Sequence, residues 1–183
     1  MRPTQLLREL RAVRRFSEQP IPDNVLTDIL EVARWTGSSK NSQPWKLVVV
    51  HDRDTLRELA TLSPNGDHLG LAQLAVVQMI DGPNVGPVFD AGRQAERLML
   101  AAWAHGIGSC IASIFPRSNQ LRAKELLDIP PDLSVGTAIL LGHPANRRAR
   151  FLSADPSVLR FPLSMRRKPL DSLVSWGRYG QHR

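Results

Sequence analysis

Apolar residues recur along this chain with two different periods, which predicts a mixture of helices and strands. Residues 23–35 and 90–105 repeat apolar positions every three to four residues, as expected of helices with one buried face. The inward positions are Val25, Leu26, Ile29, Leu30 and Ala33 in the first helix and Ala91, Ala95, Leu98, Ala102 and Trp103 in the second. Asp23 or Asn24 is placed to cap the first helix, and Gly106 to end the second.

Three predominantly apolar segments, at residues 46–51, 74–80 and 135–141, predict buried strands. Shorter helices are expected over Pro3–Leu10, over Asp54–Leu62, and from Ser118, as the cap, through Leu127. Helices outnumber strands, and the strands are not linked by a regular strand–helix–strand alternation. The pattern therefore predicts an α+β fold, with helices packed on a central, mainly antiparallel sheet. No repeat or linker divides residues 1–183, so we expect a single domain.

Composition narrows the class of protein. The chain has 183 residues, of which 42% are hydrophobic and 22% charged, as in a soluble globular domain. No apolar run approaches the roughly 20 residues that a membrane span needs, and the N-terminus lacks the apolar core of a signal peptide. The single cysteine, Cys110, cannot form an internal disulfide, which favours the cytoplasm. Cys110 is better interpreted as a small buried residue than as a nucleophile, because no neighbour in sequence would activate it.

The net charge of +7 comes entirely from one end of the chain. Residues 146–183 hold nine Lys/Arg and two Asp/Glu, whereas residues 1–145 hold fifteen of each. Prolines at 156, 162 and 169 indicate an extended arm, which could be a nucleic-acid tail, a solvated surface, or an arm docked near an anionic ligand. Docking is favoured because many of its residues need burial: Phe151, Leu152, Leu159, Phe161, Leu163, Leu170, Leu173, Val174, Trp176 and Tyr179.

Several common catalytic motifs are absent from the sequence. There is no dinucleotide-binding Gly-x-Gly-x-x-Gly after a strand, no P-loop and no Gly-x-Ser-x-Gly. The five histidines (51, 68, 105, 143 and 182) show no metal-ligand spacing with each other or with Cys110. If the protein is an enzyme, a bound cofactor is therefore expected to carry the difficult chemistry.

The segment Ser-Ser-Lys-Asn-Ser-Gln-Pro-Trp at residues 38–45 lies between a predicted helix and a predicted strand. Its hydroxyl and amide groups could reach a polar, planar ligand, although any one of them could simply form a turn. Upstream, Arg11 and Arg14 offer guanidinium groups suited to a phosphate. They share a face if this stretch is helical and point to opposite sides if it is extended. As single residues, they could equally be solvated surface arginines.

The order of these motifs resembles the nitroreductase family of FMN-dependent oxidoreductases. The matching segments are Arg11-Ala-Val-Arg14-Arg15-Phe16, Pro20-Ile-Pro22, residues 38–45, and Arg166-Arg-Lys-Pro-Leu170. The resemblance implies a homodimer with FMN at the interface, in which the basic arm 146–183 wraps the partner. It also implies a two-step reaction. NADH or NADPH gives hydride to flavin N5 and leaves, and a nitroaromatic, quinone or similar acceptor then takes the electrons. This scheme requires no side-chain acid or base.

The resemblance also implies which residues contact the cofactor. They are Arg11, Ala12 and Arg14 at the phosphate and ribityl chain; Ser38, Ser39 and Asn41 across the dimer interface; Asn65 and His68 near the pyrimidine edge; Ile111, Ala112, Ser113 and Ile114 against the ring; and Arg166 and Arg167, with Lys168 as an alternative, at the phosphate. The chain has Leu10 and Ala12 where the family often has Arg and Ser, and Gly37 where it usually has Pro. Two polar contacts are thus missing, so weaker cofactor binding is expected.

Two other functions remain as alternatives. One is a specialised branch of the same family, such as a reductive dehalogenase or a flavin-consuming biosynthetic enzyme. The short stretch 82–88 disfavours it, because it leaves little room for a substrate lid. The other is a non-catalytic, basic module for nucleic acid, which would need exposed aromatic residues among its arginines. The aromatic residues of the arm are instead expected to pack, so we do not expect nucleic acid as a partner. Since no apolar run is long enough for a membrane span, we do not expect a membrane either.

Overall fold

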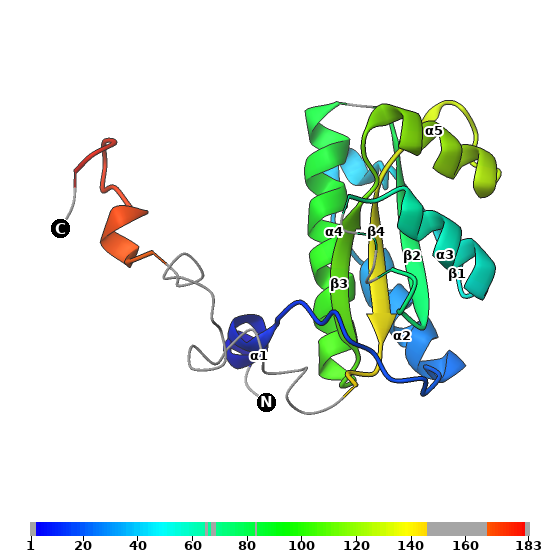
Figure 1. The fold of residues 1–183 in the computed structure, drawn as a ribbon. Helices are drawn as coiled ribbons and strands as arrows, with labels where there is room; N and C mark the ends of the chain where they lie inside the picture. The colour runs from blue at the N-terminus through cyan, green and yellow to red at the C-terminus, as the bar shows by residue number, and fades with distance from the viewer. Residues whose placement is uncertain (1–2, 65, 67–68, 83, 146–167, 182–183) are drawn as a thin grey trace.

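The computed structural model describes residues 3–64, 66, 69–82, 84–145 and 168–181. Its strands form one antiparallel sheet in the order β1-β2-β4-β3, with helices packed against it, which confirms the predicted α+β class (Figure 1). The strands are β1 (Trp45–Val50), β2 (Leu74–Asp81), β3 (Gly108–Ser113) and β4 (Leu133–Gly142). The helices are α1 (Pro3–Glu9), α2 (Asp23–Arg34), α3 (Arg53–Thr61), α4 (Val85–Ala104) and α5 (Arg117–Leu126), with short 3₁₀ turns η1 (Ser39–Asn41) and η4 (Leu170–Ser172).

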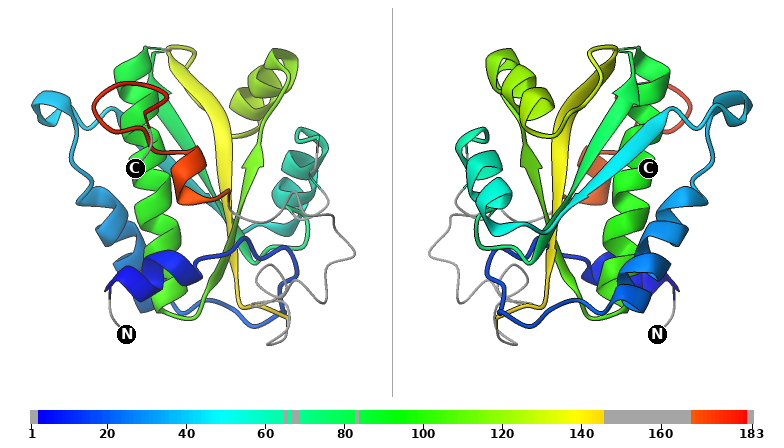
Figure 2. Two further views of the ribbon diagram at one scale, coloured as in Figure 1. Left: turned by 90° about the vertical axis from the view of Figure 1, so that its left-hand side faces the viewer. Right: turned by 90° about the vertical axis from the view of Figure 1, so that its right-hand side faces the viewer.

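The sheet is the middle layer of three. Helices α2 and α4 cover one face, and α3 and α5 cover the other (Figure 2). Successive residues of β2 alternate between the two cores: Val76 packs towards α2 and α4, whereas Ala75 and Val77 pack towards α3 and α5. Because β2 lies in the interior of the sheet with helices on both sides, its sequence is mostly apolar at consecutive positions rather than alternating between apolar and polar.

Strand β3 was not predicted. The sequence Gly-Ser-Cys-Ile-Ala-Ser lacks the run of branched apolar residues that marked the other strands, and β3 lies at the edge of the sheet. Two glycines make its position possible. A Cβ at Gly108 would lie 2.7 Å from Val13, and a Cβ at Gly142, the residue paired with Gly108, would lie 2.7 Å from Phe16. The N-terminal segment can therefore cross close to the ends of β3 and β4.

The helix ends differ in part from the prediction. Helices α2 and α5 follow Pro22 and Pro116 and have no side-chain cap, so the capping roles expected of Asp23, Asn24 and Ser118 are wrong. Helix α3 does have a cap, because Asp52 accepts a hydrogen bond from the Thr55 backbone N–H at 2.8 Å.

Helix α4 begins at Val85, five residues before the predicted start at Asp90. Its predicted inward face is confirmed, since Trp103 is 2% exposed. Gly106, with a φ of +76°, follows the end of the helix as predicted. None of the described helices is long and apolar enough to cross a membrane.

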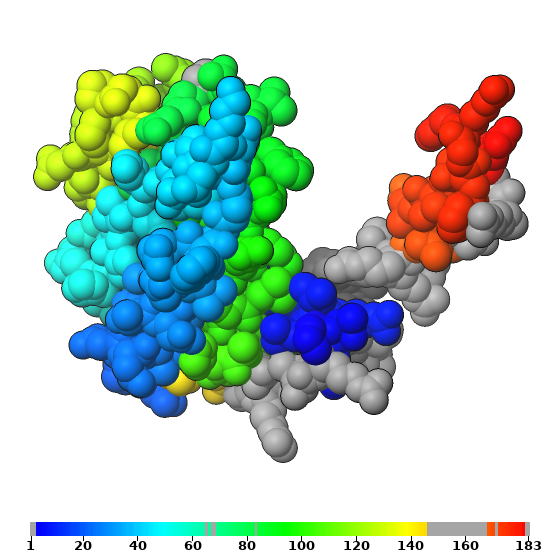
Figure 3. Space-filling model, turned by 180° about the vertical axis from the view of Figure 1, so that it is seen from behind, coloured from blue at the N-terminus to red at the C-terminus, as the bar shows by residue number. Residues whose placement is uncertain are grey.

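The described part of the basic arm, residues 168–181, keeps its large apolar side chains at the surface (orange and red in Figure 3). Leu170 is 71% exposed, Leu173 63% and Trp176 46%. The burial expected for Leu170 and Leu173 is thus not provided by the described part of their own chain. The remaining apolar residues of the arm lie in 146–167, outside the described residues.

Candidate functional site

The segment after α1 is fixed against β3. Helix α1 ends at Glu9, and the following residues are extended rather than helical. Ala12 forms a parallel bridge with Ser109 in β3, and the Val13 backbone N–H donates to the Ser109 carbonyl at 2.7 Å. This pairing brings Arg11 and Arg14 beside β3, about a hundred residues away in sequence.

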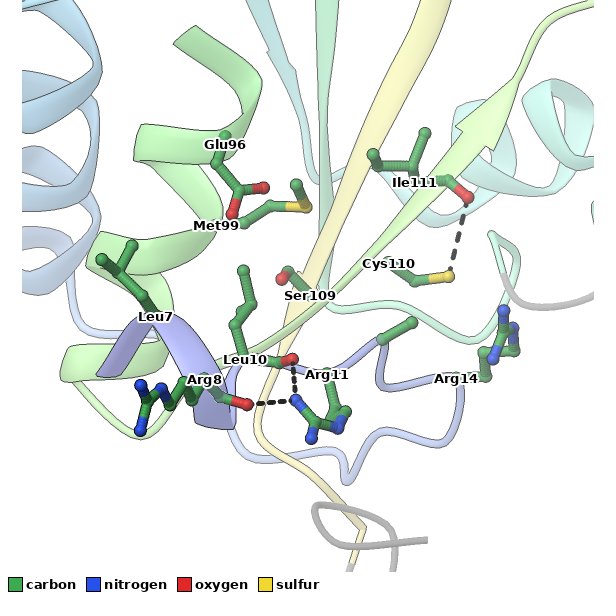
Figure 4. Close-up of a pocket in the computed structure, with 11 residues that line it drawn as sticks. Leu7, Arg8, Leu10, Arg11, Arg14, Glu96, Met99, Ser109, Cys110 and Ile111 are labelled. Carbon is green, nitrogen blue, oxygen red and sulfur yellow. Dashed lines mark hydrogen bonds between the residues drawn. The ribbon is translucent and has the colours of Figure 1, made fainter. Parts of the chain in front are cut away.

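A cavity of about 730 Å³ opens where this segment meets α4 and β3 (Figure 4). We call it the arginine cavity. It is lined by Leu7, Arg8, Leu10, Arg11, Ala12 and Arg14 from the N-terminal segment, by Glu96 and Met99 from α4, and by Ser109, Cys110 and Ile111 from β3. Its volume is within the range of small-molecule and cofactor sites.

Positive charge dominates the lining of the arginine cavity, which has three arginines and one carboxylate, Glu96. The Arg11 side chain is held at the end of α1, where its Nη1 donates to the carbonyls of Arg8 at 2.5 Å and Leu10 at 2.7 Å (Figure 4). Arg14 is exposed. Although the segment is extended, Arg11 and Arg14 line the same cavity, so both can act on one anionic ligand.

Among the described strands, β3 pairs with β4 alone, so one edge of β3 faces away from the sheet. The Ser109 carbonyl bonds to Val13 and not to β4, and backbone groups alternate sides along a strand. The backbone N–H and C=O of Ile111 and Ser113 therefore also point outward. Both of these side chains are exposed, and Ile111 lines the cavity.

The structure separates the four residues that were expected to lie against a ring. Ile111 and Ser113 are exposed on β3. Ala112 and Ile114 are instead 6% and 1% exposed and pack in the core towards α3 and α5. The alternation of side chains along a strand explains the difference. Of the four residues, only Ile111 is part of the arginine cavity.

Cys110 behaves as the sequence predicted. It is 4% exposed and belongs to the core between the sheet and helices α3 and α5. Burial raises the pKa of its thiol, and the positive charge of Arg14 offsets part of that effect. The thiol is therefore neutral at physiological pH and unsuited to act as a nucleophile.

The polar loop at residues 37–43 is held by the first half of α4. The Ser39 backbone N–H donates to the Asp90 carboxylate at 3.1 Å. Arg93 donates to the same carboxylate at 3.0 Å and to the Gly37 carbonyl at 2.9 Å. The Ser38 hydroxyl is occupied within the loop, because it accepts the Gln43 backbone N–H at 2.8 Å.

This loop and the arginine cavity are far apart in space within the folded chain. Figure 2 shows the loop (light blue) and α1 (dark blue) near opposite ends of the molecule, and no residue of the loop lines the cavity. The structure therefore does not bring Ser38, Ser39 and Asn41 together with Arg11 and Arg14. The other expected contact residues, Asn65, His68, Arg166 and Arg167, lie outside the described residues, and Lys168 is exposed.

A second cavity, of about 570 Å³, lies over the face of the sheet next to α4 and shares Glu96, Met99 and Ile111 with the arginine cavity. Its wall includes Gln78, a buried amide in the apolar run of β2 that donates to the Ala91 carbonyl and to Gln94, both at 2.9 Å. Sequence reasoning did not select Gln78, although a polar residue inside an apolar strand is a usable signal. No cluster of three or more metal-ligating side chains occurs in the described part of the chain.

The chain is similar to known proteins in both sequence and fold. The family model described as "Nitroreductase family" matches residues 7–66 and 74–143. The "Putative NADH dehydrogenase/NAD(P)H nitroreductase" of Archaeoglobus fulgidus is 33% identical over 152 residues, which cover 79% of this chain and 86% of that protein. The NADPH-flavin oxidoreductase of Vibrio harveyi is 28% identical over 150 residues, covering 73% and 62%. The solved structure of an FMN-dependent nitroreductase from Clostridium difficile R20291 has a TM-score of 0.73 and 27% identity, over 78% of this chain and 87% of that one.

Proposed function

Because this chain belongs to the nitroreductase family of oxidoreductases, we propose that it is an FMN-dependent enzyme that passes electrons from NADH or NADPH to a nitroaromatic, quinone or similar acceptor. One observation carries the proposal: Arg11 and Arg14 lie in the same cavity as Ile111 and the outward edge of β3. That arrangement suits a ligand with an anionic group at one end and a planar ring at the other.

The residues of the arginine cavity fit FMN. Guanidinium groups bind phosphate oxygens through paired, charge-assisted hydrogen bonds, so Arg11 and Arg14 would hold the phosphate. Ile111, 50% exposed, offers an apolar surface to a ring. The outward backbone groups of Ile111 and Ser113 would bond to polar atoms on the edge of the ring.

The chemistry that FMN supplies when bound is electron transfer from a reduced nicotinamide to an oxidised acceptor, in two half-reactions that use one site. The chain's own tasks are then binding and electrostatics. Its arginines neutralise the phosphate, and their positive charge favours the reduced, anionic ring. Cys110 has no acid–base part in this scheme, because its thiol stays neutral and buried.

We further propose that the enzyme is a homodimer in which each cofactor is shared between subunits. The loop residues Ser38, Ser39 and Asn41 would reach the partner's cofactor, since their own cavity lies elsewhere. The arm 146–183 would wrap the partner and bury Leu170 and Leu173, which supports the arrangement because both are exposed in the single chain. Asn65, His68, Arg166 and Arg167 are proposed as further contacts to the cofactor. The free, buried thiol of the single cysteine supports a cytoplasmic location.

The test begins with the absorbance spectrum of the purified protein, followed by titration of flavin-free protein with FMN. We expect quenched flavin fluorescence, thermal stabilisation, one FMN per subunit, and oxidation of NADH or NADPH that depends on a nitroaromatic or quinone acceptor. Saturating FMN that changes neither fluorescence nor stability would refute the proposal. Flavin binding without turnover of these acceptors would favour a specialised branch of the family instead.

A further inference from the structure

The hydroxyl of Ser109, at the wall of the arginine cavity, has no hydrogen-bond partner among the described residues. Ser109 is 1% exposed, and its Oγ is a buried polar atom without a hydrogen bond to any described residue. Its backbone carbonyl does have a partner, since it accepts the Val13 N–H at 2.7 Å. Buried polar atoms in folded proteins are nearly always hydrogen-bonded. The partner of this hydroxyl is therefore expected from outside the described chain.

The position of Ser109 indicates which part of a ligand it would meet. It lies two residues before Ile111 on the same face of β3, so roughly 6.6–6.8 Å separate the two along the strand. On its other side it is bridged to Ala12, which stands between the cationic residues Arg11 and Arg14. Ser109 thus lies between the apolar end of the arginine cavity and its cationic end (Figure 4).

We propose that Ser109 is a ligand-binding residue whose Oγ forms a hydrogen bond with a hydroxyl of the polyol chain that joins the ring and the phosphate of a flavin. The inference rests on the proposed function. A serine hydroxyl both donates and accepts, as does each hydroxyl of a polyol, so the two groups match in either direction. Leu10 and Met99 lie near Ser109 in Figure 4 and are only partly buried. A ligand would reach the Ser109 hydroxyl through rotation of the flexible Met99 side chain.

The experiment compares wild type with Ser109→Ala, using FMN, riboflavin and lumiflavin as probes. FMN and riboflavin carry the polyol chain, whereas lumiflavin has only the ring. One neutral hydrogen bond is worth about a 3- to 10-fold change in affinity. We therefore expect Ser109→Ala to lower the affinity for FMN and for riboflavin by about that factor and to leave the affinity for lumiflavin unchanged. The inference would be overturned if the variant bound each of the three flavins as tightly as wild type does. It would also be overturned if the variant lost as much affinity for lumiflavin as for FMN and riboflavin.

Thermal stability provides a second readout that does not depend on activity. An unpaired buried hydroxyl destabilises the folded chain, so Ser109→Ala should raise the melting temperature of flavin-free protein by about 2–4 °C while weakening flavin binding. Ser63→Ala is the matched control. Ser63 is also a buried hydroxyl without a partner among the described residues, but it lines neither cavity.

Ser63→Ala should therefore raise the melting temperature and leave flavin affinity unchanged. A lower melting temperature for Ser109→Ala would mean that the hydroxyl has a partner within the protein, which overturns the inference. Wild-type protein that binds no flavin would overturn the proposed function and this inference together. Wild-type binding that Ser109→Ala leaves unaltered overturns only the inference.

Discussion

The Asp90 carboxylate accepts the backbone N–H of Ser39 at 3.1 Å, a contact between residues 51 positions apart in sequence. Asp90 is only 5% exposed, and its second oxygen accepts from Arg93. One buried side chain at the second turn of α4 thus helps to hold the polar loop in position. In the proposed dimer, Asp90 would affect cofactor binding without touching the cofactor.

The first prediction concerns this contact. Asp90→Ala removes the acceptor of both the Ser39 N–H and the Arg93 guanidinium, so we expect the free energy of unfolding to fall by about 1–3 kcal/mol. FMN affinity should fall as well, because the loop would no longer be held in one conformation. Urea denaturation and fluorescence titration measure the two effects. The control is Asp54→Ala, which breaks an exposed Asp54–Arg57 ion pair and should change neither quantity.

The sequence predicted the parts of the fold that local apolar periodicity encodes. Strands β1, β2 and β4 and helices α2 and α4 were found because their own residues carry the pattern. Strand β3 was missed because it is defined by its pairing with β4 and by the bridge to Ala12, and both contacts are remote in sequence. Nothing local in Gly-Ser-Cys indicates that Ser109 would lie at the wall of a cavity.

For the candidate site, the sequence identified some of the residues but not their contacts. The two arginines and the polar loop stood out by residue type and order. What the loop touches could not be read from sequence, because Asp90 lies 51 residues away from Ser39 and only the folded chain brings the two together. Glu96 and Met99 were not selected either, since they lie on a helix face that looks solvated until α1 and β3 enclose it.

The second prediction assigns the phosphate to Arg14. Arg14→Ala should weaken FMN binding by about 10- to 150-fold, because an arginine–phosphate contact contributes roughly 1.5–3 kcal/mol. Riboflavin lacks the phosphate and should bind wild type and variant almost equally. Arg15→Ala is the control, since Arg15 is also an exposed arginine but does not line the arginine cavity. An equal loss of affinity for FMN and riboflavin would show that Arg14 does not act through the phosphate.

The third prediction follows from the raised pKa of Cys110. The folded protein holds the thiol proton more tightly than the unfolded chain, whose thiol has a pKa near 9.0. The free energy of unfolding should therefore be unaffected by this group below pH 9.0 and should fall as the pH rises above that value. Cys110→Ala lacks the titrating group, so its stability should fall less steeply there. Urea denaturation of both proteins, at neutral pH and above pH 9.0, measures the difference. Parallel curves throughout would contradict the prediction.

The last prediction concerns the exposed apolar residues of the arm. If Leu173 is buried against a partner subunit, Leu173→Asp loses about 1.5–3 kcal/mol of apolar burial and places a charge in the interface. The dimer dissociation constant should rise by at least 10- to 150-fold, and FMN affinity should fall in the same variant because each cofactor is shared. Light scattering over a range of concentrations measures the first effect and fluorescence titration the second. Leu71→Asp is the matched control, because Leu71 is similarly exposed, at 59%, but lies outside the arm. A Leu173→Asp protein that stays dimeric and binds FMN like the control would show that this leucine does not hold the subunits together.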